Sequence, residues 1–237
     1  MVTGIVLSLA GASTLAASTS AFYSIISTDT AGDPIDATAL FGLDSTGDLT
    51  LTLTNLEANI KDVGQSVTGI KFNLSGLTGR ATPSSQTGAQ ATVNSTTSLT
   101  NDGSGALLYP WGATTSLPTV TLSALGSGQP QASILGPETS GEYPNANGSI
   151  AGNGPHNPFV VATATFDFTG LGGLTNKNIT TILSSVSIGF GTAGTDYVPA
   201  NLVATPEPGS IILFLTGGIG LLVAGTRRRT ITRNDSN

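Results

Sequence analysis

Cysteine is absent from the sequence, and histidine occurs once, at position 156. Without cysteine the chain cannot form disulfide bridges, zinc–thiolate sites or a thiol nucleophile. The lone His156 excludes metal sites and catalytic pairs that need several histidines. Charge is scarce too, since 9% of the residues are Asp, Glu, Lys or Arg, against about 25% in typical globular domains. The 31 glycines, with many threonines and serines, supply the hydrophilic part of the chain instead.

Basic residues are especially rare before the C-terminal tail. Residues 22–205 contain four of them (Lys61, Lys71, Arg80 and Lys177) against twelve carboxylates, which leaves a net charge near −8. Because phosphate neutralisation supplies most of the affinity for nucleic acids, we expect no nucleic-acid partner. Adhesion to anionic lipid is disfavoured for the same reason.

One long apolar run stands near the C-terminus, from Ser210 to Gly225, and no charged residue interrupts it. A helix over Gly209–Thr226 would rise about 27 Å, enough to cross the hydrocarbon core of a membrane. Arg227, Arg228 and Arg229 follow directly. Because arginines are costly to move across a membrane, they hold the C-terminus in the cytoplasm. The sequence therefore predicts a single transmembrane helix at 210–226, a cytoplasmic tail at 230–237 and an exported domain upstream.

The triplet Pro206-Glu207-Pro208 precedes this run. A Pro-Glu-Pro triplet, a short transmembrane segment and an arginine cluster, in that order over residues 205–229, resemble the PEP-CTERM sorting signal. That signal occurs on exported proteins of Gram-negative bacteria that make extracellular polysaccharide. The resemblance implies that Pro206, Glu207 and Pro208 are recognised by an exosortase-type processing enzyme. It also implies transient anchoring in the inner membrane, then delivery to the cell surface or matrix. The alternative is an ordinary C-terminal anchor that is never cleaved.

The N-terminus has the apolar core of a secretion signal. Gly4–Ala17 is apolar, and Thr19-Ser20-Ala21 offers small residues for cleavage before Phe22. No Lys or Arg precedes Gly4, where such signals have positive charge, so we assign residues 1–21 to a weak or truncated signal peptide. The alternative is that this segment forms the first β-strand of the domain.

Residues 22–204 show a period of two, which is typical of strands with one buried face. Leu49, Leu51 and Leu53, for example, alternate with threonines. Strands are predicted around residues 22–28, 38–43, 49–54, 70–74, 119–124, 162–168 and 186–190, separated by Gly-, Pro- and Asp-rich turns such as Asn101–Gly103. Leu56–Gln65 is interpreted as a hairpin connection, and Gly79–Gly88 and Gly126–Pro158 as irregular segments. We predict an all-β domain, an antiparallel β-sandwich of about eight to ten strands.

A catalytic role finds little support in the sequence. His156, between Pro155 and Pro158, could act as a base or metal ligand if Glu138 or Glu142 folded onto it, but such a histidine is more typical of a turn that leads into a strand. The serines lack the Gly-x-Ser-x-Gly motif of a nucleophile elbow. We therefore predict no enzymatic activity, no cofactor and no resident metal.

Two binding roles remain as alternatives to a matrix protein. Exposed, flat aromatic side chains could stack on sugars, and Tyr109, Trp111 and Tyr143 are the candidates; the alternative for Trp111 is a place at one end of the core. Asp29, Asp33 and Asp36, and separately Asp44 and Asp48, could ligate calcium, although aspartates next to Gly and Pro usually form turns.

The sequence thus favours a non-enzymatic exported protein of the cell surface or extracellular matrix, associated with extracellular polysaccharide. A carbohydrate-binding β-sandwich module is the first alternative, by analogy with such modules alone. A calcium-stabilised, adhesin-like protein is the second.

Overall fold

The computed structural model describes residues 18–126 and 130–203, and residues up to Val203 form one compact unit. The signal segment Gly4–Ala17, the Pro206–Pro208 triplet, the helix at 210–226 and the arginines after it lie outside the described residues. The unit is all-β, as predicted, with a 3-10 turn η1 (Val63–Gln65) and one helical turn α1 (Ile179–Ile182). Its thirteen strands are β1 (Thr19–Thr28), β2 (Pro34–Leu43), β3 (Leu49–Asn55), β4 (Val67–Leu74), β5 (Ser85–Ser95), β6 (Ser98–Ala106), β7 (Gly112–Ser116), β8 (Thr119–Ser123), β9 (Ile134–Leu135), β10 (Phe159–Phe168), β11 (Leu183–Phe190), β12 (Tyr197–Pro199) and β13 (Asn201–Val203).

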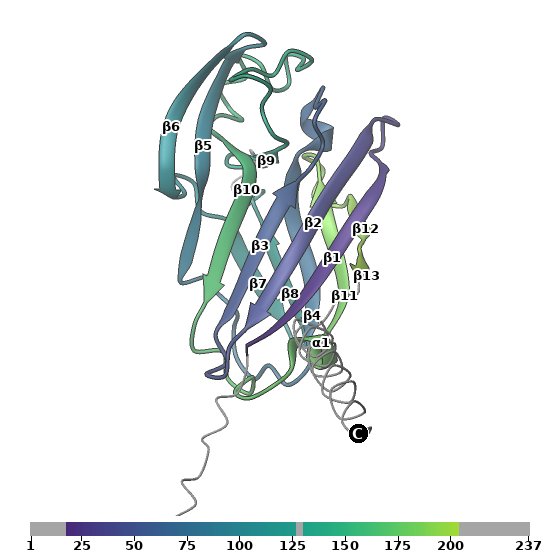
Figure 1. The fold of residues 1–237 in the computed structure, drawn as a ribbon, viewed down its shortest axis with the longest axis vertical. Coiled ribbons are helices and arrows are strands. Elements are labelled where there is room, and N and C mark those ends of the chain that lie inside the picture. The colour runs from purple at the N-terminus through teal and green to yellow at the C-terminus, as the bar shows by residue number, and fades with distance from the viewer. Residues whose placement is uncertain (1–17, 127–129, 204–237) are drawn as a thin grey trace, which may run out of the picture. The chain divides into compact units, whose positions relative to one another are not determined.

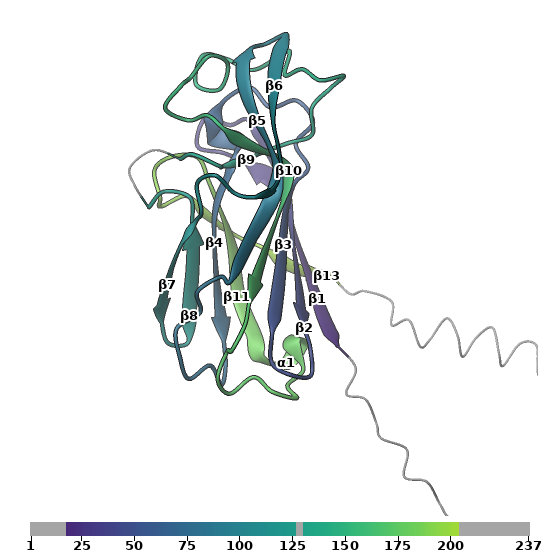
Figure 2. The ribbon, with the colours of Figure 1, turned by 90° about the vertical axis from the view of Figure 1, so that its left-hand side faces the viewer.

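The strands form a continuous sheet that folds over into two facing layers (Figure 2). One layer contains β1, β2, β3 and β10, and continues into the hairpin of β5 and β6. The other contains β11, β4, β8 and β7. The short strand β9 pairs with both β4 and β10 and so connects the layers. The prediction of only antiparallel pairs is wrong for β9 and β10, which run parallel, and the predicted eight to ten strands are fewer than the thirteen found.

The last described segment closes one side of this arrangement. β12 pairs with β11, whereas β13 pairs with β1, and only Ala200 separates the two strands. Residues 197–203 therefore cross from one layer to the other. The Lys71 ammonium group lies 4.5 Å from the centre of the Tyr197 ring and helps to hold β12 against β4.

Both ends of the described unit lie nearer the start of β1 than the β1–β2 turn. β1 begins at Thr19, and Val203 at the end of β13 pairs with Phe22 in β1. The β1–β2 turn, η1 and the segment 136–158 lie at the opposite end, which is the top of Figure 1. This polarity separates the exit points of the chain from the loops at the far end.

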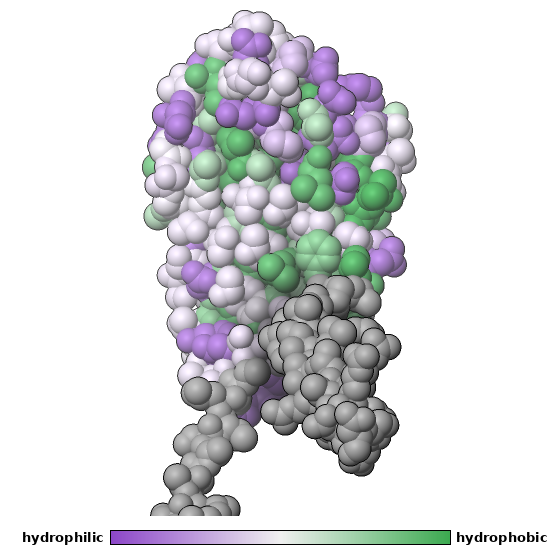
Figure 3. Space-filling model, viewed as in Figure 1, coloured by the Kyte–Doolittle hydropathy of each residue, from purple (hydrophilic) through white to green (hydrophobic). Residues whose placement is uncertain are grey.

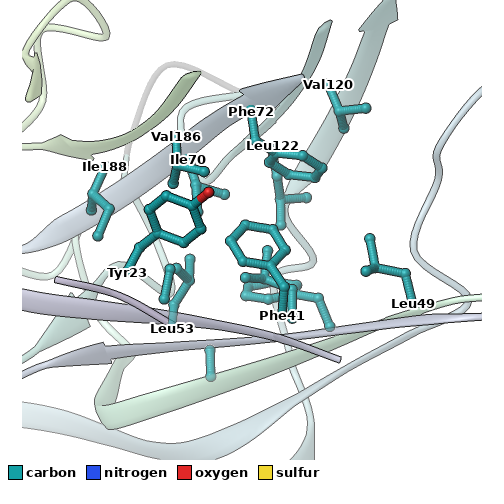
Figure 4. Packing of buried hydrophobic residues seen from close by; sticks show 14 of the residues in the cluster. Tyr23, Phe41, Leu49, Leu53, Ile70, Phe72, Val120, Leu122, Val186 and Ile188 are labelled. Carbon is teal, nitrogen blue, oxygen red and sulfur yellow. The ribbon is translucent and has the colours of Figure 1, made fainter. Parts of the chain in front are cut away.

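The core between the layers follows the predicted alternation. Leu49, Leu51 and Leu53 are buried, while the threonines between them point outward. Tyr23, Phe41 and Phe72 meet edge to face across the interior, with ring centres 6.0 Å and 5.1 Å apart (Figure 4). Burial of each large side chain contributes about 1.5–3 kcal/mol, so this interior is the main source of stability.

The prediction missed several elements. Strands β6 and β7 have polar residues on both faces, so no apolar alternation marks them, and in β5 the alternation is limited to Ala89, Ala91 and Val93. Asn101–Gly103 is not a turn but part of β6, where the pairing with β5 shifts in register beside Gly103. Gly79–Gly88 is strand from Ser85 onward. The described residues of the predicted irregular segment Gly126–Pro158 are irregular except for β9, which is too short to show a period.

Two further boundaries differ from the sequence-based assignment. Leu56–Gln65 is not a hairpin connection, because it joins β3 to β4 and these strands lie in different layers. Thr19, Ser20 and Ala21, assigned above to the signal peptide, belong to β1 and pair with Leu43, Gly42 and Phe41. Cleavage before Phe22 would remove these three paired residues from the sheet.

Candidate functional site

Two of the three aromatic candidates are buried. Trp111 is 3% exposed, packs against Phe166 with ring centres 5.1 Å apart, and donates its indole N–H to the carbonyl oxygen of Ala132 at 2.9 Å. It therefore belongs to the core, the second of the two interpretations given above. Neither of its ring faces is open to a sugar, so the prediction of a stacking role for Trp111 is wrong.

Tyr143 is also 3% exposed, and its hydroxyl donates to the carbonyl oxygen of Gly136 at 2.9 Å. Burial raises the pKa of this hydroxyl, and the negative charge of Glu138 raises it further. Tyr143 anchors the segment 136–158 in a second hydrophobic cluster that includes Ile60 and Phe159. The prediction that Tyr143 stacks on sugars is therefore wrong as well.

Tyr109 is the aromatic candidate whose ring remains accessible, at 43% exposure. It lines a shallow cavity of about 280 Å³ together with Pro110 and Gln131. A ring beside an amide can contact the apolar face and the hydroxyl groups of a sugar at once. Of the three aromatic side chains predicted to stack on sugars, Tyr109 alone is therefore accessible.

His156 is placed for a structural role. Its Nδ1 lies 2.8 Å from the carbonyl oxygen of Ser149, which can only accept, so Nδ1 carries a proton. The ring meets Phe159 edge to face, with centres 6.5 Å apart. Within residues 18–126 and 130–203, no hydrogen bond joins His156 to Glu138 or Glu142, which the base hypothesis requires.

Asn157 completes this turn. Its Oδ1 accepts from the backbone N–H of Val93 at 2.8 Å, and its Nδ2 donates to the carbonyl oxygen of Asn153 at 3.0 Å. The first bond ties the segment before β10 to β5, and the second closes the turn itself. The predicted role of the histidine segment, a turn leading into a strand, agrees with these contacts.

Three carboxylates converge at the far end of the unit. Oxygen atoms of Asp29, Asp33 and Asp62 lie within 4.8 Å of one another. Asp29 and Asp33 were expected together, but Asp36 is not part of the group and Asp62 takes its place. Asp62 is the cap of η1, so only the tertiary fold brings it to the β1–β2 turn.

A lysine side chain already supplies a positive charge to this acidic group. The Lys61 ammonium group forms an ion pair with Asp33, and this pairing raises the pKa of Lys61. Asp29 also accepts the backbone N–H groups of Ala31 and Asp33, at 2.9 Å and 2.8 Å. The carboxylates are thus used by the turn itself and by Lys61.

The second predicted acidic pair, Asp44 and Asp48, forms the β2–β3 turn. One oxygen of Asp44 accepts hydrogen bonds from the hydroxyl and N–H of Thr46 and from the N–H groups of Gly47 and Asp48. The Thr46 hydroxyl is the main cause of a lowered pKa for Asp44. This geometry is an Asx turn, as the neighbouring glycine favoured.

A larger cavity of about 450 Å³ lies beside the acidic group. The β1–β2 turn contributes Thr28, Asp29 and Thr30 to it, and the β11–β12 loop contributes Asp196 among others. Its hydroxyls and carboxylates can hydrogen-bond a polar ligand. Sequence analysis missed this cavity because its two walls are far apart in the chain and neither has a motif.

Along the described part of the chain, no helix combines the length and the apolar character needed to cross a membrane. The sorting residues Pro206, Glu207 and Pro208 and the arginines 227–229 lie outside that part. The chain matches no protein-family model, no curated protein and no solved structure in comparisons with known proteins.

Proposed function

We propose that this chain is a non-enzymatic exported protein of the cell surface or extracellular matrix, sorted by its own C-terminal segment. The observation that carries the proposal is the order of three elements in residues 205–229: the Pro206–Pro208 triplet, the apolar run and the arginine cluster. Their resemblance to the PEP-CTERM signal implies an exosortase-type enzyme as partner and the inner membrane as a transient one. We propose that the mature protein is associated with extracellular polysaccharide.

The fold is compatible with a domain tethered at one end. β1 begins at Thr19, and Val203 pairs with Phe22, so both lie nearer the start of β1 than the β1–β2 turn. Six residues, 204–209, separate Val203 from the apolar run, and they span at most about 20 Å. We propose that in the anchored state the domain is a β-sandwich, followed in the chain by a single transmembrane helix at 210–226.

Deletion of the tail tests the anchor. In a Gram-negative host that exports the chain, the full-length protein should be recovered with the inner membrane while it awaits processing, whereas residues 1–205 should be soluble after export. Replacement of Arg227, Arg228 and Arg229 by Asn should keep the apolar run but weaken the preference for a cytoplasmic C-terminus. Recovery of the full-length chain as soluble protein, unprocessed by mass, would overturn the proposal.

Contact with polysaccharide is a second candidate, and the accessible Tyr109 ring beside a cavity favours it. Tyr109→Ala should abolish retardation of the domain in gels that contain the polysaccharide of a producing strain. Leu108→Ala is the matched control, because Leu108 is the neighbouring residue and is 60% exposed. Equal retardation of the wild type and both variants would show that Tyr109 does not bind the polysaccharide.

A further inference from the structure

The outer surface of β1, β2 and β13 has an apolar row. Leu40 pairs with Phe22, and Phe22 pairs with Val203, so the three side chains lie next to one another across the strands. Leu40 and Val203 are 42% and 38% exposed. Ile26, four residues farther along β1 on the same surface, is 83% exposed. We call these four residues the apolar row.

The neighbouring surface of the same layer is different. On β3 and β10 the outward positions are polar and face one another, as Thr52 with Thr165, Thr54 with Thr163 and Thr50 with Asp167 do. Figure 3 shows the contrast, with hydrophobic side chains (green) gathered over β1, β2 and β13 and a largely white surface over β3. Exposed apolar groups that gather in one place, beside a surface rich in threonine, indicate a contact surface.

The position of the row in the chain indicates what it contacts. Val203 is a member of the row and also the last residue of the described unit. The apolar run begins seven residues later, at Ser210, and the six intervening residues reach at most about 20 Å. A membrane that holds the run therefore lies within reach of the row.

The charges near the row favour a neutral surface over an anionic one. Asp36 faces Ile26 across β1 and β2, and its carboxylate would be repelled by anionic headgroups. Asp29, Asp33 and Asp62 lie beyond the end of β1 that is farther from Val203. Lys61, at the same far end, is paired with Asp33 and adds no attraction.

We propose that the surface of β1, β2 and β13 rests on uncharged lipid headgroups while the C-terminal segment is anchored, with the apolar row inserted at the interface. This inference rests on the proposed membrane anchor. Removal of the tail would free the row together with the domain, because single aliphatic and aromatic side chains at an interface give only weak, reversible membrane affinity.

The absence of cysteine permits a direct test. Ser24→Cys places a unique thiol between Phe22 and Ile26 on the same surface, and Thr114→Cys places one on β7, in the other layer, as the matched control. The full-length variants, labelled with a polarity-sensitive fluorophore, are reconstituted into phosphatidylcholine vesicles. Nitroxide-labelled lipid then measures how close each site lies to the bilayer.

We expect quenching at position 24 to exceed that at position 114 at least threefold, and Ile26→Asp with Leu40→Asp to remove the difference. Equal quenching at both positions in vesicle-bound protein would overturn the lipid contact but not the anchor. If the full-length chain does not float with the vesicles, the anchor itself fails, and this inference fails with it. Circular dichroism of each variant checks that the strands remain.

Discussion

Within one layer, the half formed by β3 and β10 and the half formed by β1 and β2 pack on the same core, but their outer surfaces differ. Beneath β3 and β10, Leu51 and Phe166 are fully buried, and beneath β2 so is Phe41. Outside, β3 and β10 present threonines and Asp167, whereas β1 and β2 present Phe22, Ile26 and Leu40. The comparison shows that alternation determines which residues enter the core. Alternation does not determine the type of the outward residues, which are hydrophilic on one part of the layer and apolar on another.

The largest expected effect concerns the shared interior. Phe41→Ala and Phe166→Ala each remove a fully buried ring, and each should lower the free energy of unfolding by about 3–5 kcal/mol. Urea denaturation followed by circular dichroism measures the loss. A cost below about 1 kcal/mol at one position alone would mean that the two halves of the layer do not share one core.

The threonine surface should respond more weakly. The hydroxyls of Thr54 and Thr163 are 3.2 Å apart across β3 and β10, and such a pair contributes about 0.2–1 kcal/mol. Alanine at either position should lose that amount, and the double variant should cost no more than the larger single loss. Strict additivity in the double-mutant cycle would show that the hydroxyls do not interact.

A smaller change in stability is expected if the apolar row is made to resemble its neighbour. Leu40→Thr replaces a 42% exposed side chain and should alter the free energy of unfolding by less than about 0.5 kcal/mol. Its retention on a hydrophobic-interaction column should nevertheless fall, because the row loses a member. Thr165→Ser on β10 is the control and should leave retention unchanged. A large loss of stability would place Leu40 in the core.

Asp36 and Asp44, near opposite ends of β2, should give the smallest effects, with opposite signs. Burial raises the pKa of Asp36, and the nearby charge of Glu57 raises it further. The folded state therefore loses stability as pH rises through that raised pKa, and Asp36→Asn should be the more stable form at pH 7 but not below about pH 4.

The pKa of Asp44 is lowered, chiefly by the Thr46 hydroxyl. Asp44 therefore contributes stability above its unfolded pKa, and this is lost as pH falls through the lowered one. Asp44→Asn should be the less stable form at pH 7. Melting temperatures measured between pH 3 and pH 7 test both variants, and a shift of the same sign for both would contradict the assignment.

Sequence alone predicted the all-β class and the buried leucines of β3, because period-two alternation marks a half-buried strand directly. It missed β6, whose polar residues lack that alternation, and β5, where the alternation is limited to Ala89, Ala91 and Val93. It did not foresee that residues 136–158 bury Tyr143 under a second cluster, since packing of an irregular segment has no period. The cluster of Asp62 with Asp29 and Asp33, likewise, arises from tertiary structure alone.

The central proposal concerns residues 205–229, and the mass of the exported protein tests it most directly. In a strain that makes an exosortase-type enzyme, the wild-type chain should be cleaved near the Pro206–Pro208 triplet. It should therefore lose the C-terminal residues and leave the inner membrane. Glu207→Ala should stay in the inner membrane with its tail intact. If both proteins keep the tail and remain in the inner membrane, the segment is a permanent anchor, and the proposed sorting role is contradicted.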